Sequence, residues 1–324
     1  MITYHQLRTF LAVARTGNIT KAARELNAKQ PTVSLQLHAL RGFLGKPLFE
    51  RPGGRFRLTP AGERLRHYAE DAVGGLRNLQ QEVATIKGSL AGPLAVGATF
   101  VMTRYVLGSI LSRFLEQAPG IELQLYVELP EQLFTSLLAN RLDVASYINV
   151  PAPPGLTVEK LCDEEFAIVV SPDHPLAHGR RVAPGRLANE PFVASASPPL
   201  RSLIDAKLRC AGVSPRVTAE ARHQDAIKKL VERKIGYSML IASAVAGELA
   251  SGRLARVNLA GPPIMAELVA AYRSQTAASA LVVAFVEFIR GELKQRAGGT
   301  VAVPQRPRVV TAGRSTRSQR SRRR

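Results

Sequence analysis

The first 45 residues alternate between short apolar stripes of helical period and tight turns. One stripe lies before Gly17 and consists of Leu7, Phe10, Leu11 and Ala14. A second begins after Pro31 and consists of Val33, Leu37, Leu40 and Leu44. Both spacings are those of one face of an α-helix. Residues 19–26 predict a further short helix, in which the small side chains of Ala22 and Ala23 allow another helix to cross closely.

The helices predicted around the turn at residues 27–29 have the order of a helix-turn-helix. Pro31 suits the first turn of the second helix, where a missing N–H costs nothing. Its non-apolar face is polar and consists of Gln30, Thr32, Ser34, Gln36 and His38. Such side chains can contact base edges and phosphates in a major groove. On the motif alone, the competing interpretation is an amphipathic helix whose polar face meets only water.

Residues 47–59 predict a hairpin, because two short extended runs flank a Pro-Gly-Gly turn. Its tip carries Arg51, Arg55 and Arg57. Directly after a helix-turn-helix, such a hairpin is interpreted as a wing that meets phosphate or a minor groove.

A long helix is predicted from Pro60, with Thr59 as its cap. Apolar residues recur along it with alternating spacings of four and three, at Leu65, Ala69, Ala72, Leu76, Leu79, Val83, Ile86 and Leu90. This heptad seam predicts pairing with another helix across a dimer, and the alternative is packing against its own domain.

From residue 91 the pattern changes to alternating strands and helices, which predicts an α/β domain with a mainly parallel sheet. The expected strands are residues 94–98, 121–128, 144–148, 166–170, 192–194, 237–241 and 268–272, with another near Val217. The expected helices are residues 104–115, 131–139, 201–211, 225–233 and 277–292.

Basic charge is concentrated at the two ends of the chain. The net charge of +19 divides into +8 for residues 1–90, +1 for residues 91–293 and +10 for residues 294–324. A neutral body with basic ends favours nucleic acid as partner. No apolar run is long enough to span a membrane and no signal core precedes the first helix, so we expect a cytoplasmic, nucleoid-associated protein.

Catalytic and metal-binding motifs are not found in the sequence. The six histidines lack metal spacing, and neither a nucleophile elbow nor a phosphate loop occurs. Cys162 and Cys210 are far apart and are expected to be inert thiols. We therefore expect no enzyme activity, no cofactor and no metal site.

The N-terminal 65 residues resemble the LysR-type transcriptional regulator family. The matching runs are LRTFLAVARTGNITKAARELN, QPTVSLQL, GKPLFER and LTPAG. Departures are Asn18 in place of Ser, Leu35 in place of a DNA-contacting Arg, and Arg41 in place of Glu. Residues 137–161 look most like the nitrogen-assimilation-control branch.

The resemblance implies an N-terminal all-α winged helix-turn-helix domain that binds DNA, a long linker helix and a C-terminal, two-lobed, periplasmic-binding-protein-like α/β effector domain. The expected boundaries are residues 1–59, 60–90 and 91–293, followed by a basic disordered tail, 294–324. Lobe I would comprise about 91–162 and 267–293, and lobe II 163–266. The residues assigned to DNA are Lys21, Gln30, Pro31, Thr32, Ser34, Gln36, Arg51 and Arg55. The implied partners are promoter DNA, RNA polymerase, a small-molecule effector and further copies of the chain, as a homodimer or homotetramer.

An effector site is predicted where strands end and helices begin, because free N–H groups at helix N-termini favour anions. The residues assigned to it are Thr99, Phe100, Val101, Ser195, Ser197 and Arg201. The resemblance adds Pro130, which replaces the usual Ser or Thr. The competing interpretation is that the hydroxyl groups of the Ser and Thr residues in this set only cap the helices that follow them. The competing function is a nonspecific, architectural DNA-binding protein with a ligand-binding domain.

Overall fold

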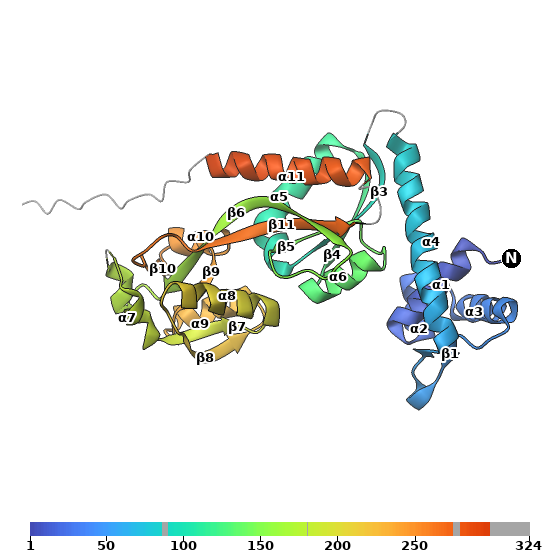
Figure 1. Cartoon of the computed structure of the whole chain (residues 1–324), viewed down its shortest axis with the longest axis horizontal. Coiled ribbons are helices and arrows are strands. Elements are labelled where there is room, and N and C mark those ends of the chain that lie inside the picture. The colour runs from blue at the N-terminus through green and yellow to red at the C-terminus, as the bar shows by residue number, and fades with distance from the viewer. Residues whose placement is uncertain (86–89, 180, 275–278, 299–324) are drawn as a thin grey trace, which may run out of the picture.

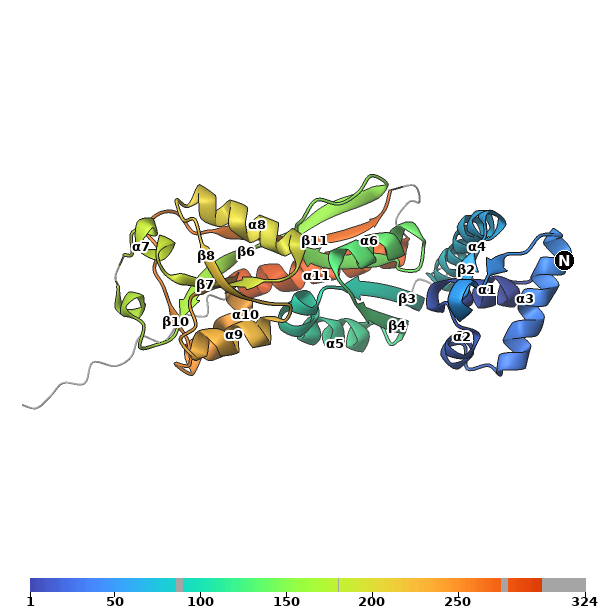
Figure 2. The same ribbon diagram turned by 90° about the horizontal axis from the view of Figure 1, so that it is seen from below.

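The computed structural model describes residues 1–85, 90–179, 181–274 and 279–298. A small helical domain, one long helix and a two-lobed α/β domain follow one another along the chain (Figure 1). The helical domain and lobe II lie at opposite ends of the molecule, with lobe I between them (Figure 2). The predicted start of the disordered tail at residue 294 is wrong, because residues 294–298 belong to the last helix, α11 (Ala280–Gly298). From residue 299 onward the tail lies outside the described residues, so its predicted disorder stays a prediction.

The N-terminal domain contains the predicted helix-turn-helix and wing. Its helices are α1 (Tyr4–Thr16), α2 (Ile19–Glu25) and α3 (Gln30–Leu44). Thr3 and Gln6 form a capping box at the start of α1, and Gly17 ends that helix with φ of 62°. Strands β1 (Phe49–Glu50) and β2 (Arg57–Leu58) pair antiparallel and form the wing.

Helix α4 (Pro60–Thr85) leaves this domain and runs to lobe I (Figure 1). The prediction of a helix continuing to Leu90 is wrong at its end. Leu90 is not helical; it is half-buried against the core of lobe I and leads into the first strand there. Ile86 lies outside the described residues.

Lobe I contains three parallel strands, β3 (Ala91–Ala98), β4 (Gly120–Val127) and β5 (Val144–Ile148). Helices α5 (Gly108–Gln117) and α11 (Ala280–Gly298) cover one face, and α6 (Pro130–Leu138) covers the other. Successive side chains of β5 point to opposite faces of the sheet, which explains this layering. Val144 packs in the same core as α5 and α11, whereas the next residue, Ala145, packs in the same core as α6. The first four residues of the predicted helix at 104–115 belong to a π-helical turn, Met102–Leu107, and α5 follows it directly.

Lobe II has its own strands and helices. Its strands are β7 (Pro191–Ser195), β8 (Arg216–Ala221), β9 (Ser238–Ile241) and β10 (Ala255–Arg256). Its helices are α7 (Pro184–Ala188), α8 (Pro198–Cys210), α9 (Gln224–Glu232) and α10 (Ala242–Ala250), with a 3-10 turn at Pro175–His178. The sequence patterns missed α7, α10, β10 and the 3-10 turn.

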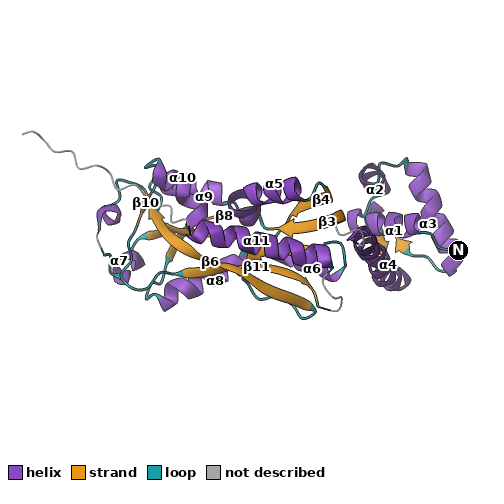
Figure 3. Cartoon of the chain, turned by 90° about the horizontal axis from the view of Figure 1, so that it is seen from above, coloured by secondary structure: helices purple, strands orange, loops and turns teal. Residues whose placement is uncertain are grey.

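Two long strands cross between the lobes, β6 (Leu156–Val170) and β11 (Met265–Arg273) (Figure 3). They pair antiparallel with each other, and β11 also pairs antiparallel with β5. The expectation of a mainly parallel sheet is therefore wrong where the lobes join, because the chain crosses once in each direction. The first ten residues of β6 were also not predicted as a strand. Polar and apolar residues alternate there, as in a partly exposed strand, but other structures show the same pattern.

Helix α4 is fixed to lobe I by an ion pair with its supporting hydrogen bonds. Arg77 Nε donates to Asp143 Oδ1 at 3.0 Å, and its two other guanidinium nitrogens donate to the backbone oxygens of Arg141 and Asn140. Asp143 also accepts hydrogen bonds from Gln81 Nε2 and from the backbone N–H of Ala95. We call these contacts the Arg77–Asp143 clamp.

A close approach accompanies the clamp. A Cβ added at Gly74 would lie 1.9 Å from Asn140 Nδ2, so only glycine lets α4 approach lobe I this closely at that point. Asn140 itself has a positive φ of 53° at the end of α6. A glycine inside a helix lowers helix propensity and can mark a bend, and at Gly74 the structure shows tight packing against Asn140.

Arg77→Met should lower the free energy of unfolding of the full chain by about 3 kcal/mol at neutral pH, because it leaves a buried carboxylate without its cation. Burial already raises the pKa of Asp143, and Arg77 opposes this shift. In the variant the carboxyl is protonated more readily, so the loss should shrink as the pH falls. Urea unfolding at pH 7.5 and pH 5.5 measures both effects.

Arg66→Met is the matched control on the same helix. Its ion pair with Glu63 is exposed, so we expect a loss below about 1 kcal/mol. Equal losses in the two variants, independent of pH, would contradict the role assigned to the clamp.

Candidate nucleic-acid interface and ligand site

One face of α3 is open to solvent, as the amphipathic pattern predicts. Val33 and Leu40 are buried, whereas Gln30, Pro31, Thr32 and Ser34 are exposed. Lys21 of α2 is also exposed. These residues are placed to contact a partner, and nothing in their own domain covers them.

Gln36 differs from its neighbours on α3. It is half-buried, and its Oε1 accepts a hydrogen bond from the buried Thr9 hydroxyl of α1. This hydrogen bond from α1 fixes the orientation of the Gln36 side chain.

Leu35 is the exposed apolar residue of this face, with 70% of its surface accessible. An exposed leucine has no role in the core of its own domain. It stands where the family resemblance expects arginine, and its methyl groups are open to a partner.

The wing is fixed to the domain through aromatic packing. The Phe49 ring lies 5.2 Å from Phe10 and 5.6 Å from Phe56 between centroids. The Arg51 guanidinium stacks over Phe56 at 4.1 Å, which holds it at the base of the turn. Arg55 and Arg57 are exposed, so all three arginines lie on the wing as predicted.

The heptad seam of α4 divides into two parts. Leu65 and Ala69 are buried in the core of the N-terminal domain, so packing against the own domain accounts for them. Leu76, Leu79 and Val83 are exposed, the last two with 51% and 56% of their surface accessible. The distal half of the seam is therefore an apolar stripe that no described part of this chain covers.

Segments from both lobes meet where parallel strands end. In lobe I, Thr99 follows β3, and its N–H donates to Ser146 of the neighbouring β5. In lobe II, β7 and β8 are parallel, and the Ala196 N–H donates to Ala221. This edge is where open α/β sheets bind ligands.

The lobes touch through an aromatic pair and a charged network. The Phe100 and His223 rings lie 5.3 Å apart. Tyr105 Oη donates to Asp225 at 2.6 Å, and the buried Lys228 ammonium lies 3.0 Å from Asp225 and 4.8 Å from the Tyr105 ring centroid. Burial lowers the pKa of Lys228, but its contacts with Tyr105, Asp225 and Glu248 outweigh burial and raise it.

Two buried polar atoms on these segments have no hydrogen-bond partner, Thr99 Oγ1 and Gln224 Oε1. A buried polar atom without a partner is costly, and a bound ligand or water removes that cost. Gln224 was not among the predicted site residues. Its position at the start of α9, directly after β8, obeys the same strand-end rule that selected Thr99.

The other predicted effector residues are less open. Val101 and Pro130 are buried, as are Ser195 and Ser197, and the Ser195 hydroxyl accepts from the Ser197 N–H at 3.3 Å. Arg201 is paired with Asp205 and Glu220, each at 2.7 Å, so an anion must compete with two carboxylates for it.

A groove of about 550 Å³ runs along α6 and reaches Pro199 of lobe II. None of the seven predicted effector residues lines it. The groove begins beside two of the predicted segments, because Pro130 opens α6 and Pro199 follows Ser197 by two positions.

Among the described residues no cluster has the composition of a metal site, and no helix is long and apolar enough to cross a membrane. Cys162 and Cys210 are both free, and burial raises the pKa of Cys162 to about 11.

Sequence comparison identifies both parts of the chain. Residues 4–63 match the family described as "Bacterial regulatory helix-turn-helix protein, lysR family", and residues 87–294 match "LysR substrate binding domain". The RuBisCO operon transcriptional regulator of Acidithiobacillus ferrooxidans is 31% identical and covers 89% of this chain and 93% of its own. The activator CmpR of Synechocystis is 30% identical, with 89% and 94% covered. The branch suggested by residues 137–161 stays a prediction.

Solved structures share the fold over nearly the whole length. Full-length OxyR from Pseudomonas aeruginosa matches with a TM-score of 0.70 at 22% identity, covering 91% of this chain and 95% of that one. CbnR in complex with its target DNA matches with a TM-score of 0.63 at 23% identity, covering 89% and 99%. The two-lobed, periplasmic-binding-protein-like fold predicted from the sequence is confirmed.

Tyr105→Phe should loosen the contact between the lobes by about 1 kcal/mol, because it removes one hydrogen bond and leaves the ring in place. We expect faster amide hydrogen exchange at residues 102–107, with the cores of both lobes unchanged. Tyr126→Phe is the control, since the Tyr126 hydroxyl donates only to Gln124 on its own strand. Unchanged exchange at residues 102–107 would show that Tyr105 does not hold the lobes together.

Proposed function

Because the chain belongs to the LysR family of bacterial transcriptional regulators, we propose that the exposed face of α3 reads promoter DNA under the control of an effector bound between the lobes. The observation that carries this proposal is the open polar face of Gln30, Thr32 and Ser34 beside an arginine-bearing wing. The helix supplies base contacts, and the wing and Lys21 supply phosphate contacts.

Dimerisation is the second part of the proposal. The stripe of Leu76, Leu79 and Val83 supports pairing of two α4 helices, since exposed leucines at heptad spacing gain most from a second helix. A dimer presents two α3 helices to two half-sites. Strand β4 forms one edge of the sheet and exposes Leu125, Tyr126 and Val127, which supports a further contact that builds a tetramer.

Effector control requires different affinities for at least two arrangements of the assembly. The unpaired Thr99 and Gln224 atoms support a polar effector between the lobes, and the helix N-termini there favour an anion. Binding shifts the lobes, and this shift changes DNA bending and contact with RNA polymerase. A regulatory rather than catalytic role is supported by the relatives, which are regulators by name.

Footprinting tests the DNA-binding face. The purified full-length protein should give a discrete footprint on its own upstream intergenic DNA that survives moderate salt. Ser34→Ala combined with Gln36→Ala should abolish it, because base contacts carry sequence preference whereas phosphate contacts do not. A RuBisCO operon promoter is the second DNA to test, given the names of two relatives.

The matched control is Ser112→Ala combined with Gln117→Ala, which makes the same chemical changes at two exposed positions of α5 in lobe I, outside the N-terminal domain. This variant should keep the footprint. Diffuse protection that fades with salt and ignores the α3 changes would favour the architectural alternative, in which the basic N-terminal domain only binds phosphate.

Leu35 should read a thymine methyl group, since apolar side chains discriminate thymine by this contact. Leu35→Ala should weaken specific binding by about tenfold. Replacing the contacted thymine by uracil removes only the methyl group and should weaken the wild type similarly, while adding nothing to the variant. Titrations with a set of singly substituted operators measure this double-mutant cycle, and additive losses would contradict the contact.

A further inference from the structure

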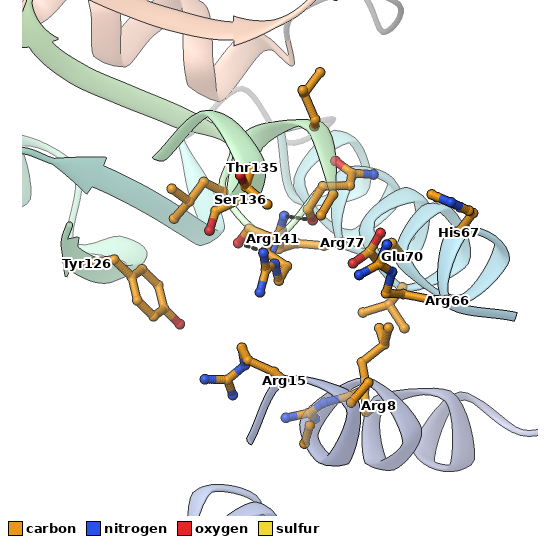
Figure 4. Close-up of a pocket in the computed structure, with 18 of the residues that line it drawn as sticks. Arg8, Arg15, Arg66, His67, Glu70, Arg77, Tyr126, Thr135, Ser136 and Arg141 are labelled. Atoms are coloured by element: carbon orange, nitrogen blue, oxygen red, sulfur yellow. Dashed lines mark hydrogen bonds between the residues drawn. The ribbon is translucent and has the colours of Figure 1, made fainter. Parts of the chain in front are cut away.

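A cavity of about 700 Å³ lies between the N-terminal domain, α4 and lobe I (Figure 4). Its size is that of sites that hold small organic ligands. Arg8 and Arg15 of α1 form one wall, and Arg66 and Glu70 of α4 form another. Lobe I contributes Arg141, which Figure 4 shows between these walls and Tyr126.

The arginines of this cavity are unequally paired. Arg15, Arg66 and Arg77 have carboxylate partners in Glu25, Glu63 and Asp143, respectively. Among the described residues the one partner of the Arg8 side chain is the Tyr4 ring, whose centroid lies 5.7 Å from the guanidinium carbon. Arg141 has no ion pair or side-chain hydrogen bond within the described part of the chain, and its Nε is buried without an acceptor.

The neighbouring charges do not fully compensate Arg141. Burial lowers the pKa of Arg15 and the proximity of Arg141 adds to this shift, although Tyr126 and Glu128 oppose it. Glu70 and Glu128 also line the cavity, but burial raises the pKa of Glu70, and Glu128 accepts a hydrogen bond from Ser136. An acceptor for the buried Nε of Arg141 is therefore lacking on the protein side.

This cavity is separate from the predicted effector site. None of Thr99, Pro130, Ser197 or the other predicted effector residues lines it. Its walls come from three parts of the protein, one of which carries the DNA-reading helix. A molecule bound here would touch α1 and lobe I at once.

We propose that the cavity between α1, α4 and lobe I is a second ligand site, which binds a small phosphate-bearing molecule through Arg141, Arg8 and Arg15. A phosphate group offers several acceptor oxygens and matches the planar fork of a guanidinium, so it supplies the partner that Arg141 lacks. Bound between α1 and lobe I, the ligand fixes the N-terminal domain against the effector domain and adds a second input to regulation.

Equilibrium dialysis of the full-length protein with radiolabelled inorganic pyrophosphate, at constant ionic strength, tests the site. We expect one molecule per chain, with affinity lowered at least about tenfold by Arg141→Gln, which keeps polarity and removes the charge. Arg186→Gln, an exposed arginine on α7 of lobe II, is the matched control and should bind like the wild type. Far-ultraviolet circular dichroism verifies that both variants are folded.

Hydrogen exchange supplies the second measurement. Pyrophosphate should slow exchange in the second half of α1 in the wild type, and this protection should be lost in Arg141→Gln although residue 141 lies in lobe I. Equal affinity of wild type and Arg141→Gln would place the anion elsewhere, for example on the DNA-contacting surface, and would overturn the proposal. Failure of the wild type to bind pyrophosphate would also overturn it.

Discussion

The Arg77–Asp143 clamp is the constraint on which the arrangement of the whole chain depends. Its charged atoms are buried, so neither side chain can leave without exposing the other to an apolar environment. Beside the clamp, the absence of a side chain at Gly74 lets Asn140 pack directly against α4. One turn after Arg77, Gln81 of the same helix donates a second hydrogen bond to the Asp143 carboxylate. The direction in which α4 leaves lobe I is thereby fixed, and with it the position of the DNA-reading domain.

The same physical rule governs both functional faces. On α3, the side chains that do not pack in the core of the N-terminal domain are exposed to solvent. These exposed side chains include an apolar one, Leu35. Between the lobes, the fold buries the polar atoms Thr99 Oγ1 and Gln224 Oε1 without partners. In each case the protein alone leaves an interaction unmade, and the proposed partners are those whose chemistry would complete it.

Local patterns in the sequence were sufficient for the N-terminal domain. The stripe through Val33 and Leu40 located the buried face of α3, and Pro31 and Gly17 marked helix ends. Strand β5 was predicted to the residue, and all five of its residues are buried. The features that the sequence did not predict depend on partners far away in the chain. The polar first part of β6 is a strand because it pairs with β11. The orientation of Gln36 is set by Thr9, 27 residues earlier. The heptad spacing predicted a long helix with an apolar seam. It could not show that Leu65 is buried in the core of the N-terminal domain whereas Leu79 is exposed to solvent.

The two crossing strands give the molecule a mechanical asymmetry. The described polar contacts of α4 with the effector domain all lie in lobe I, so the DNA-reading domain, α4 and lobe I behave as one frame. Lobe II is connected to these parts by the two strands β6 and β11. The register in which these strands pair shifts between Leu268 and Val269. Both of these residues also pair with β5, so the irregularity lies within the sheet of lobe I. Substitutions on the surfaces of lobe II that face away from lobe I therefore leave the contacts that hold α4 unchanged.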